Sequence, residues 1–359
     1  MAEQTQLSAQ QRAQLFVQST RQNRHMLPSQ SLGEYDTATI TLPKNRLLSK
    51  VAFRVEMSVN VKHATKKSID VDTFTPYKIL RRVSLDLNNG FSPYVLNGKE
   101  LAMYSMVGMH PDIVVPQNVN ERGFCFMPDM VASTAGTSNK IAFTCELPVA
   151  LNDKEPVGLI LLQSQETQVN LIIETATAGD IFENADGYTI ALESLKITPY
   201  TTTFTVPNNA NAFPDLSALK LVHARTEQFA GAGSNIVRLA TGTIYRKLIV
   251  YITDSDGNPM SDSDINGSIE LVFNQADINY QIAPNVLATM NEAELGYPLP
   301  KGMYVFDFSS AGFISNYGNV RDLVDSEKLT EFWLRFPTTK AGNVTIVSET
   351  ITRLSTGVN

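Results

Sequence analysis

Alternation of apolar and polar residues, repeated along most of the chain, constrains the fold more than any other feature. In residues 50–59, KVAFRVEMSV, apolar side chains occupy every second position from Val51 to Val59. A period of two places successive side chains on opposite faces of a strand, so this segment is expected to be a strand with one buried face. Ten further segments have a similar β texture: 37–42, 140–149, 157–163, 169–174, 188–198, 242–253, 267–274, 303–308, 331–336 and 343–351.

Helical patterns are rare between these segments. Turn residues separate the candidate strands at 88–90 (NNG), 184–187 (NADG) and 254–259 (DSDGNP). One internal segment, 283–296, reads as a helix, with Pro284 near its start and Gly296 at its end. Regularly spaced strands without alternating helices predict an antiparallel all-β protein, either a sandwich or a barrel.

The length of 359 residues and a hydrophobic content of 43% favour two domains with sizeable cores. Residues 198–215 contain three prolines and three asparagines and are the best candidate for a linker. We expect an N-terminal basic helical arm at 1–35, a first β domain at 36–200, a linker at 201–215 and a second β domain at 216–359. Two domains of similar size suggest a duplication, although no residue-level repeat is visible.

The N-terminal segment differs from the rest of the chain in charge and composition. Residues 8–25 are rich in Gln, Ala and Arg and contain no Gly or Pro, and Ser8 is a plausible N-cap, so a short helix is predicted. No Asp or Glu occurs from residue 4 to residue 33, whereas Arg12, Arg21 and Arg24 are basic. Such a short helix is marginal alone, so it either docks on a partner or frays as a tail.

Composition excludes several classes of protein. A net charge of −7 argues against a general nucleic-acid binder, whose surface would be basic. Cys125 and Cys145 lie in apolar stretches and are expected to be reduced, buried thiols. The sequence lacks both an apolar run of membrane-spanning length and the apolar core of a signal peptide, so we expect a soluble protein made in the cytoplasm.

No catalytic or metal-binding pattern stands out. The four histidines are scattered, and no G-x-S-x-G elbow, P-loop or dinucleotide fingerprint occurs. The acidic segment 254–262 invites a calcium interpretation, but its glycine falls at the fourth position and the closing glutamate is missing, so a hairpin turn is expected. The basic segment 62–67, KHATKK, is either a solvated hairpin tip or a contact with an acidic neighbour or a host surface. We expect no enzymatic activity, no metal and no cofactor.

Two stretches of the sequence resemble a known family. Residues 6–26, QLSAQQRAQLFVQSTRQNRHM, resemble the Gln/Ala/Arg-rich leader of tectivirus-type major capsid proteins, from tailless bacteriophages with an internal membrane. The second match is a helix followed by Pro300-Lys301-Gly302, a strand from Met303 and a loop to the YGNV at 317–320. The resemblance implies two tandem eight-stranded jelly rolls, a double jelly roll, with an N-terminal helix and one or a few short helices.

The resemblance also implies a function. It predicts a structural major capsid protein whose homotrimers form pseudo-hexagonal capsomers in an icosahedral shell, around an internal lipid membrane that encloses the dsDNA genome. The protein would be synthesised in the host cytoplasm and located in the virion. Its implied partners are further copies of itself, penton and minor capsid proteins, and the internal membrane, without sequence-specific binding of nucleic acid.

The N-terminal arm is the candidate site for contact with the membrane or a neighbouring capsomer. Its basic and apolar side chains could meet anionic head groups or another capsomer. The candidate residues are Arg12, Leu15, Phe16, Arg21 and Arg24. Deleting residues 2–27 is expected to impair assembly or membrane association and to leave the trimer intact.

Two other interpretations remain open. A carbohydrate-binding or lectin-like β-sandwich would display aromatic side chains, but Trp333 lies in EFWLRF, a strand that is apolar on both faces, which favours burial against a partner domain. A viral spike protein would carry repeats or a fibrous segment, and none is visible. Asp307, the single charge in the strand at 303–308, is expected at an edge, a strand end or a subunit contact, where it keeps water or a partner.

Overall fold

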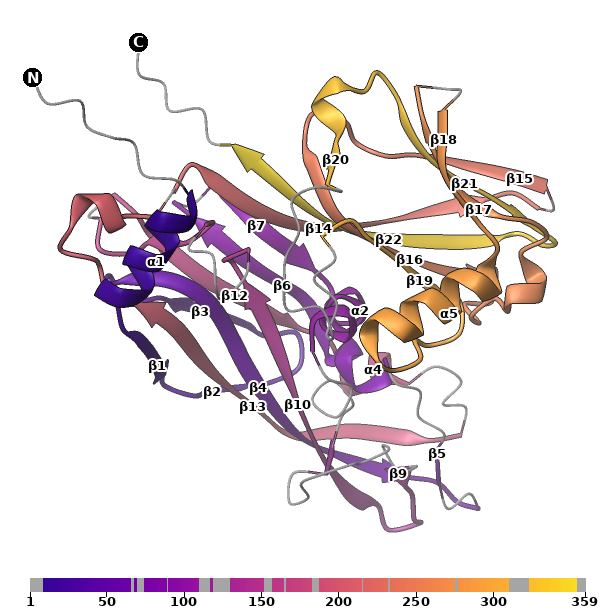
Figure 1. Cartoon of the computed structure of the whole chain (residues 1–359). Coiled ribbons are helices and arrows are strands. Elements are labelled where there is room, and N and C mark those ends of the chain that lie inside the picture. Colours follow the sequence, from indigo (N-terminus) through magenta and orange to yellow (C-terminus); the bar gives the residue numbers. More distant parts are fainter. Residues whose placement is uncertain are drawn as a thin grey trace, which may run out of the picture. The chain divides into compact units, whose positions relative to one another are not determined.

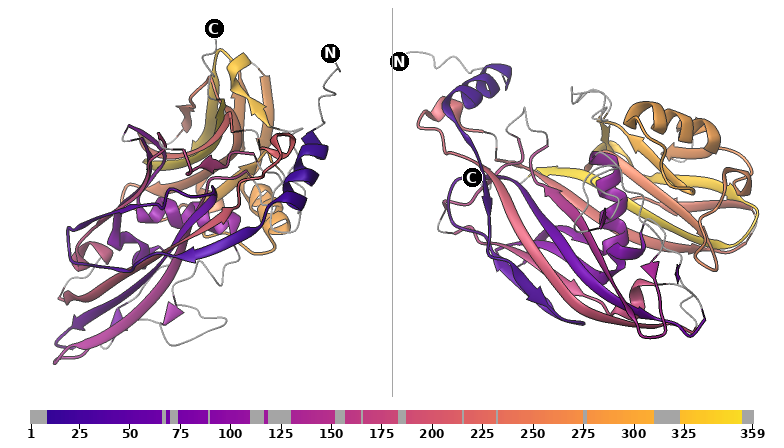
Figure 2. Two further views of the ribbon diagram at one scale, coloured as in Figure 1. Left: turned by 90° about the vertical axis from the view of Figure 1, so that its left-hand side faces the viewer. Right: turned by 90° about the horizontal axis from the view of Figure 1, so that it is seen from below.

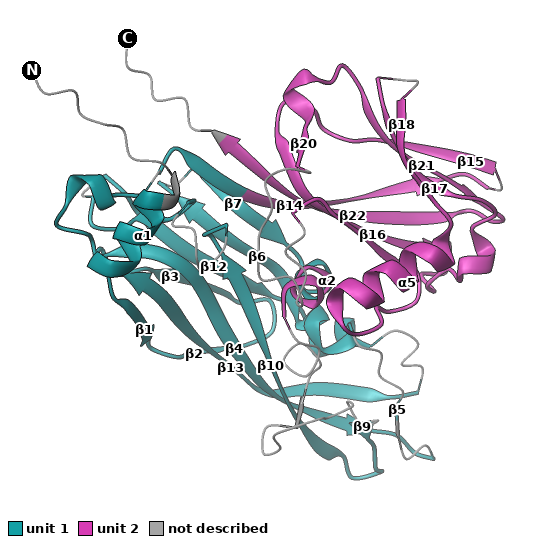
Figure 3. Ribbon diagram, in the orientation of Figure 1, with its two compact units in different colours: residues 1–102, 112–220, 353–359 teal, residues 103–111, 221–352 magenta. Residues whose placement is uncertain are grey.

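The structure is a computed structural model in which the chain forms two compact units (Figures 1 and 3). It describes residues 9–65, 68–69, 74–88, 90–109, 117–118, 130–151, 157–164, 166–182, 187–214, 216–231, 233–274, 277–309 and 323–353. Unit 1 comprises residues 1–102, 112–220 and 353–359, and unit 2 comprises residues 103–111 and 221–352. The domain limits expected from the sequence, including the linker, stay a prediction.

Unit 1 contains two sheets of antiparallel strands. The first has the order β1-β13-β4-β10-β8, with β2 beside β13 and β11 beside β4, and the second has the order β3-β12-β6-β7. The strands are β1 (Gln22–Met26), β2 (Gln30–Leu32), β3 (Thr37–Thr41), β4 (Leu47–Lys62), β6 (Leu80–Leu87), β7 (Phe91–Leu96), β8 (Gln117–Asn118), β10 (Thr137–Pro148), β11 (Ile160–Leu161), β12 (Val169–Thr175) and β13 (Thr189–Phe204). A small pair, β5 (Ser68–Ile69) with β9 (Met130–Val131), lies apart from them.

Strand β4 forms the centre of the first sheet, as the strict alternation of its sequence predicts. It pairs antiparallel with β10 on one side and with β13 on the other. Its apolar positions from Val51 to Val59 are buried, whereas Arg54 and Glu56 on the other face are half-buried and form an ion pair. Figure 2 shows the long strands of this sheet from two further sides.

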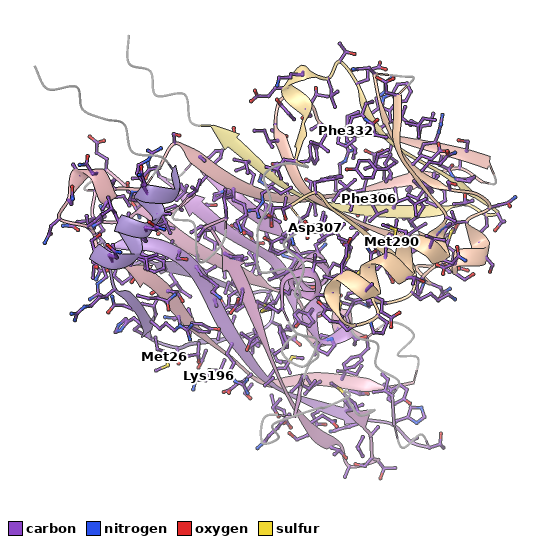
Figure 4. All side chains as sticks on the ribbon, in the orientation of Figure 1. Met26, Lys196, Met290, Phe306, Asp307 and Phe332 are labelled. Carbon is purple, nitrogen blue, oxygen red and sulfur yellow. The ribbon has the colours of Figure 1, made fainter. Side chains whose placement is uncertain are left out.

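Unit 2 contains two four-stranded sheets around a common core. Their orders are β14-β22-β16-β19 and β15-β21-β17-β18, and the two-residue strand β20 (Val324–Asp325) lies beside β16. Figure 4 labels two of the core side chains, Phe306 from one sheet and Phe332 from the other. The strands are β14 (Ala218–Phe229), β15 (Gly233–Arg238), β16 (Ile244–Asp254), β17 (Ile269–Phe273), β18 (Asp277–Ile282), β19 (Met303–Asp307), β21 (Phe332–Thr338) and β22 (Gly342–Arg353).

The two units repeat one strand order. When strands of two or three residues are set aside, eight strands remain in each unit among the described residues. Ranked along the chain, they lie in the orders 1-8-3-6 and 2-7-4-5 in both units. A helix separates the fifth strand from the sixth in each case: α2 (Gly98–Gly108) follows β7, and α5 (Pro284–Leu295) follows β18. The two units are therefore alike in topology, and the duplication suggested by domain size stays a prediction.

The helices differ from the sequence prediction in two places. The N-terminal helix α1 spans Ala9–Ser19, and the predicted remainder of that helix, residues 22–25, belongs to β1. The prediction of a single internal helix is wrong, because α2 and the short α4 (Ala178–Ile181) also form. The expected helix at 283–296 is confirmed as α5, and Gly296 ends it with a φ of 83°. The described residues also contain four short 3₁₀ turns: η1 (Thr75–Ile79), η2 (Ala210–Ala212), η3 (Asp262–Asp264) and η4 (Ser326–Lys328).

Most predicted strands are present, with altered ends. The segment 157–163 contributes only the two residues of β11. Strand β13 runs on to Phe204, so the first residues of the proposed linker pair with β4 and β1 in the first sheet. The segment 254–259 is a hairpin turn, as expected: the Asp254 side chain accepts hydrogen bonds from the backbone N–H groups of Asp256 and Asn258.

Candidate functional site: the N-terminal arm

Helix α1 is held on unit 1 by one buried aromatic side chain. Phe16 is 3% exposed and packs in a cluster with Leu47, Ala150 and Leu159. Its ring centroid lies 5.4 Å from that of Phe204 in an edge-on arrangement. Burying a phenylalanine contributes about 1.5–3 kcal/mol, which supplies the docking partner that an 11-residue helix requires.

The chain changes from helix to strand directly after this anchor. The hydroxyl groups of Ser19 and Thr20 donate hydrogen bonds to the carbonyl oxygens of Leu15 and Phe16, each at 2.7 Å, and so cap the end of α1. The backbone N–H of Thr205 then donates to the carbonyl oxygen of Arg21 at 3.0 Å, which starts the pairing of β1 with β13. In the right-hand view of Figure 2, α1 lies beside η2, which it contacts.

The five predicted arm residues differ in their exposure to solvent. Arg12, Arg21 and Arg24 are exposed, on α1, at the junction and on β1 respectively. Leu15 is half-buried. Phe16 is buried inside unit 1. In the docked helix, only the other four predicted residues are therefore available for the predicted contact with a membrane or another capsomer. Leu15 and Phe16 are adjacent apolar residues, and the sequence alone did not indicate which of the two side chains would face inward.

The proposed deletion of residues 2–27 would remove more than an arm. It would take away β1, which is paired along its length with β13, and the buried side chain of Leu27. A deletion that ends at Ser19 removes α1 and keeps the sheet intact.

Unit 2 buries two ion pairs that lie next to each other along β16. The Nζ atom of Lys247 lies 2.8 Å from Oδ2 of Asp307, and the Nε atom of Arg246 lies 3.4 Å from Oε1 of Glu349. The hydroxyl of Tyr104 donates to the other oxygen of Glu349 at 2.5 Å. Each of these charges has a charged partner, so this group presents no free acid or base for catalysis.

Asp307 lies where its isolated charge predicted, at the end of β19 with a partner. Its Oδ1 atom accepts hydrogen bonds from the backbone N–H and the hydroxyl of Ser309, at 2.9 and 2.6 Å. Its Oδ2 atom is buried and close to Lys247 but is not aligned for a regular hydrogen bond. The attraction between these two side chains is therefore mainly that of an ion pair.

Another acidic side chain, that of Glu193, accepts hydrogen bonds from neutral side chains. A β-bulge in β13 leaves Glu193 without an opposite residue in β4. Its carboxylate accepts hydrogen bonds from Ser138, Ser58 and Asn60 at 2.5–2.9 Å. These bonds, that from Ser138 foremost, hold the pKa of Glu193 below its usual value. Within the described ranges, no group of three or more His, Cys, Asp or Glu side chains could hold a metal ion.

Of the other residues that the sequence singled out, one is buried and several lie outside the described residues. Cys145 is buried, as expected, and burial raises the pKa of its thiol well above the usual value, whereas Cys125 and His110 lie outside the described residues. The residues Lys66 and Lys67 of the basic loop and the YGNV at 317–320 also lie outside them. In the part of the chain that the structure describes, no helix is long and apolar enough to cross a membrane.

Trp333 lies on the outer face of its sheet. Its neighbours Phe332, Leu334 and Phe336 point into the core of unit 2, and Trp333 itself is half-buried on the opposite side. The outer face of this strand therefore carries Trp333 beside the charged Arg335, which forms an ion pair with Glu270. The expected burial of Trp333 against a partner domain stays a prediction.

Comparison with known proteins identifies the fold. No family model matches the sequence, and no curated protein matches it. Among solved structures, the major capsid protein of Sulfolobus Turreted Icosahedral Virus is similar over 93% of this chain and 97% of its own, with a TM-score of 0.68 and 15% identity. VP54 of PBCV-1 matches over 94% and 95%, with a TM-score of 0.62 and 11% identity.

A phage protein has a similar fold. The major capsid protein P2 of bacteriophage PM2 matches over 94% of this chain and 100% of its own, with a TM-score of 0.53 and 10% identity. These matches confirm a mostly β fold shared with viral major capsid proteins. At 10–15% identity the likeness concerns the fold.

Proposed function

We propose that the protein is the major capsid protein of a virus, of the double jelly-roll class. The observation that carries the proposal is a match to capsid proteins that includes nearly all of this chain and nearly all of theirs. Two units with one repeated strand order support the assignment of two jelly rolls, each with two packed four-stranded sheets. The tectivirus type, a phage with an internal membrane, is the finer part of the proposal and rests on the resemblance at 6–26 and 300–320.

In this proposal three copies form a pseudo-hexagonal capsomer, because each chain contributes two similar domains. The capsomers tile an icosahedral shell, together with penton and minor capsid proteins, around an internal membrane and a dsDNA genome. The N-terminal arm faces the membrane. Its three exposed arginines, in a segment without acidic residues, suit anionic head groups.

The native mass of the purified full chain tests this function. A capsomer has three times the chain mass of 39.5 kDa, and electron microscopy of concentrated protein should show hexagonal plates or closed shells. A chain that remains monomeric at the concentrations used for assembly, and that binds sugars, would overturn the capsid assignment in favour of the lectin-like alternative.

Neutralising the arm should weaken binding to an anionic membrane. With each basic residue near such a surface contributing about 1 kcal/mol, Arg12→Gln with Arg21→Gln should lower vesicle affinity by about 2 kcal/mol, or roughly 30-fold. Co-sedimentation with phosphatidylglycerol vesicles at low salt measures this. The matched control, Lys196→Gln with Lys301→Gln, removes the same charge from exposed positions outside the arm. Equal losses in both variants would contradict a membrane role of the arm.

A further inference from the structure

Among the described residues, each unit has a sheet edge without a neighbouring strand. Strand β1 ends the first sheet of unit 1, and β18 ends one sheet of unit 2. The bonds from Thr205 to Arg21 and from Leu27 to Pro199 direct the odd-numbered residues of β1 toward β13. In an antiparallel strand the alternate residues then turn their backbone groups the other way, which leaves Gln22, Arg24 and Met26 facing the open side. Such an edge is a template for another chain unless it is covered.

Both edges carry apolar side chains that are exposed to solvent. Met26 on β1 is 67% exposed, and Ile278 on β18 is 42% exposed. Figure 4 labels Met26 on the surface of unit 1. Ile278 ends a cross-strand row that also contains Val272 and Trp333 on the outer face of its sheet. An apolar row that reaches an open edge is typical of a protein interface, where Trp is enriched.

Val272 shows how this row is arranged. It is 1% exposed, although it is on the outer face and outside the core cluster of unit 2. In the row it is flanked by Trp333 on one side and by Ile278 on the other. The three residues thus form one apolar row that ends at the edge strand β18.

The charges of the two edges are complementary. Strand β1 and the junction before it carry Arg24 and Arg21, in a segment without acidic residues. Strand β18 begins with the exposed carboxylate of Asp277 and contains no basic residue. The opposite edge of the same sheet, β15, ends with the exposed Arg238 and would repel β1.

We propose that the β18 edge of one copy contacts the β1 edge of a second copy, with Met26 against the Ile278 row and Arg24 near Asp277. The inference rests on the proposed capsid function and names the surfaces that join the trimer. A closed ring of three requires two different, complementary surfaces on each chain, and here each unit supplies one. A register shift at Val272 in the pairing of β17 with β18 interrupts regular pairing, so side chains carry most of the contact.

Charge reversal tests the contact in the full-length protein. Arg24→Glu and Asp277→Arg are each expected to raise the concentration at which half of the trimers dissociate by at least tenfold, because each places like charges together. The double variant, Arg24→Glu with Asp277→Arg, exchanges the two charges. It should dissociate at the wild-type concentration. Lys301→Glu makes the same charge change as Arg24→Glu at an exposed turn and should have no effect. Mass photometry across a dilution series measures the oligomer.

Cysteine cross-linking gives a second readout if a charge variant does not fold. Met26→Cys combined with Ile278→Cys should yield covalent dimers and trimers under mild oxidation, whereas either substitution alone should yield none, since the two surfaces differ. A monomeric wild type would overturn the capsid function itself. A trimeric wild type that is insensitive to the reversals, or that gives no cross-link with the cysteine pair, would overturn only the edge contact.

Discussion

We expect Gly98→Ala to destabilise unit 1 by on the order of 3 kcal/mol, because an over-packed site must move backbone to accommodate even one methyl group. Gly98 is the first residue of α2, and a Cβ atom there would lie 1.7 Å from the carbonyl oxygen of Tyr77 and 2.6 Å from its carbonyl carbon. Tyr77 is fully buried, with its ring centroid 4.3 Å from that of Phe143, so it has no room to retreat. A chemical denaturation curve followed by far-UV circular dichroism should show a lower midpoint.

Gly108→Ala in the same helix is the matched control. A Cβ atom there meets nothing within 4 Å. Replacing an unconstrained helical glycine reduces the entropy of the unfolded chain and stabilises by about 0.4–1 kcal/mol. If the two variants unfold at the same denaturant concentration, the close approach of α2 to Tyr77 is not a constraint on this fold.

The same helix shows what the sequence could have revealed. Asn97 and Glu100 form a reciprocal capping box: the Glu100 N–H donates to the Asn97 side chain at 2.9 Å, and the Asn97 N–H donates to the Glu100 carboxylate at 2.8 Å. This Asn-x-x-Glu spacing before an apolar run is a helix-start signal. The residues that follow are buried on nearly every face of the helix, including Leu101, Met103 and Met106. The sequence therefore has no amphipathic period that would support the prediction of a helix here.

Strand β1 illustrates the opposite limit. Its sequence, QNRHM, has no apolar alternation, and four of its five residues are exposed. Its strand conformation comes from pairing with β13, a partner about 175 residues away in the chain. The long strands β4, β10 and β22 could be predicted because their alternation matches a half-buried sheet, whereas pairing at an edge leaves no such pattern.

The repeated strand order was also hidden from the sequence. The two units share a topology without visible residue repeats, because many apolar patterns satisfy the same pair of packed sheets. For the arm, the three exposed arginines could be predicted from charge alone. The inward position of Phe16 could not, since the cluster that receives it is assembled from β4 and from residues 150, 159 and 204.

The second large effect is expected at the buried ion pair of unit 2. Asp307→Ala should destabilise this unit by about 3–5 kcal/mol, because it leaves a buried lysine without its counter-charge. The Lys247 and Asp307 side chains are only 8% and 4% exposed. The chain contains a single tryptophan, Trp333 in unit 2, so its fluorescence during denaturation reports this unit directly.

Two further variants separate the charge from the loss of packing. Lys328→Ala breaks an exposed ion pair with Asp325 in the same unit and should cost no more than about 1 kcal/mol. Lys247→Met with Asp307→Leu removes both buried charges and should recover most of the stability lost in Asp307→Ala, since a buried pair replaced by apolar residues is often neutral. A double variant as unstable as Asp307→Ala would show that the hydrogen bonds from Ser309 to Asp307, rather than the neutralisation of Lys247, carry the energy at the end of β19.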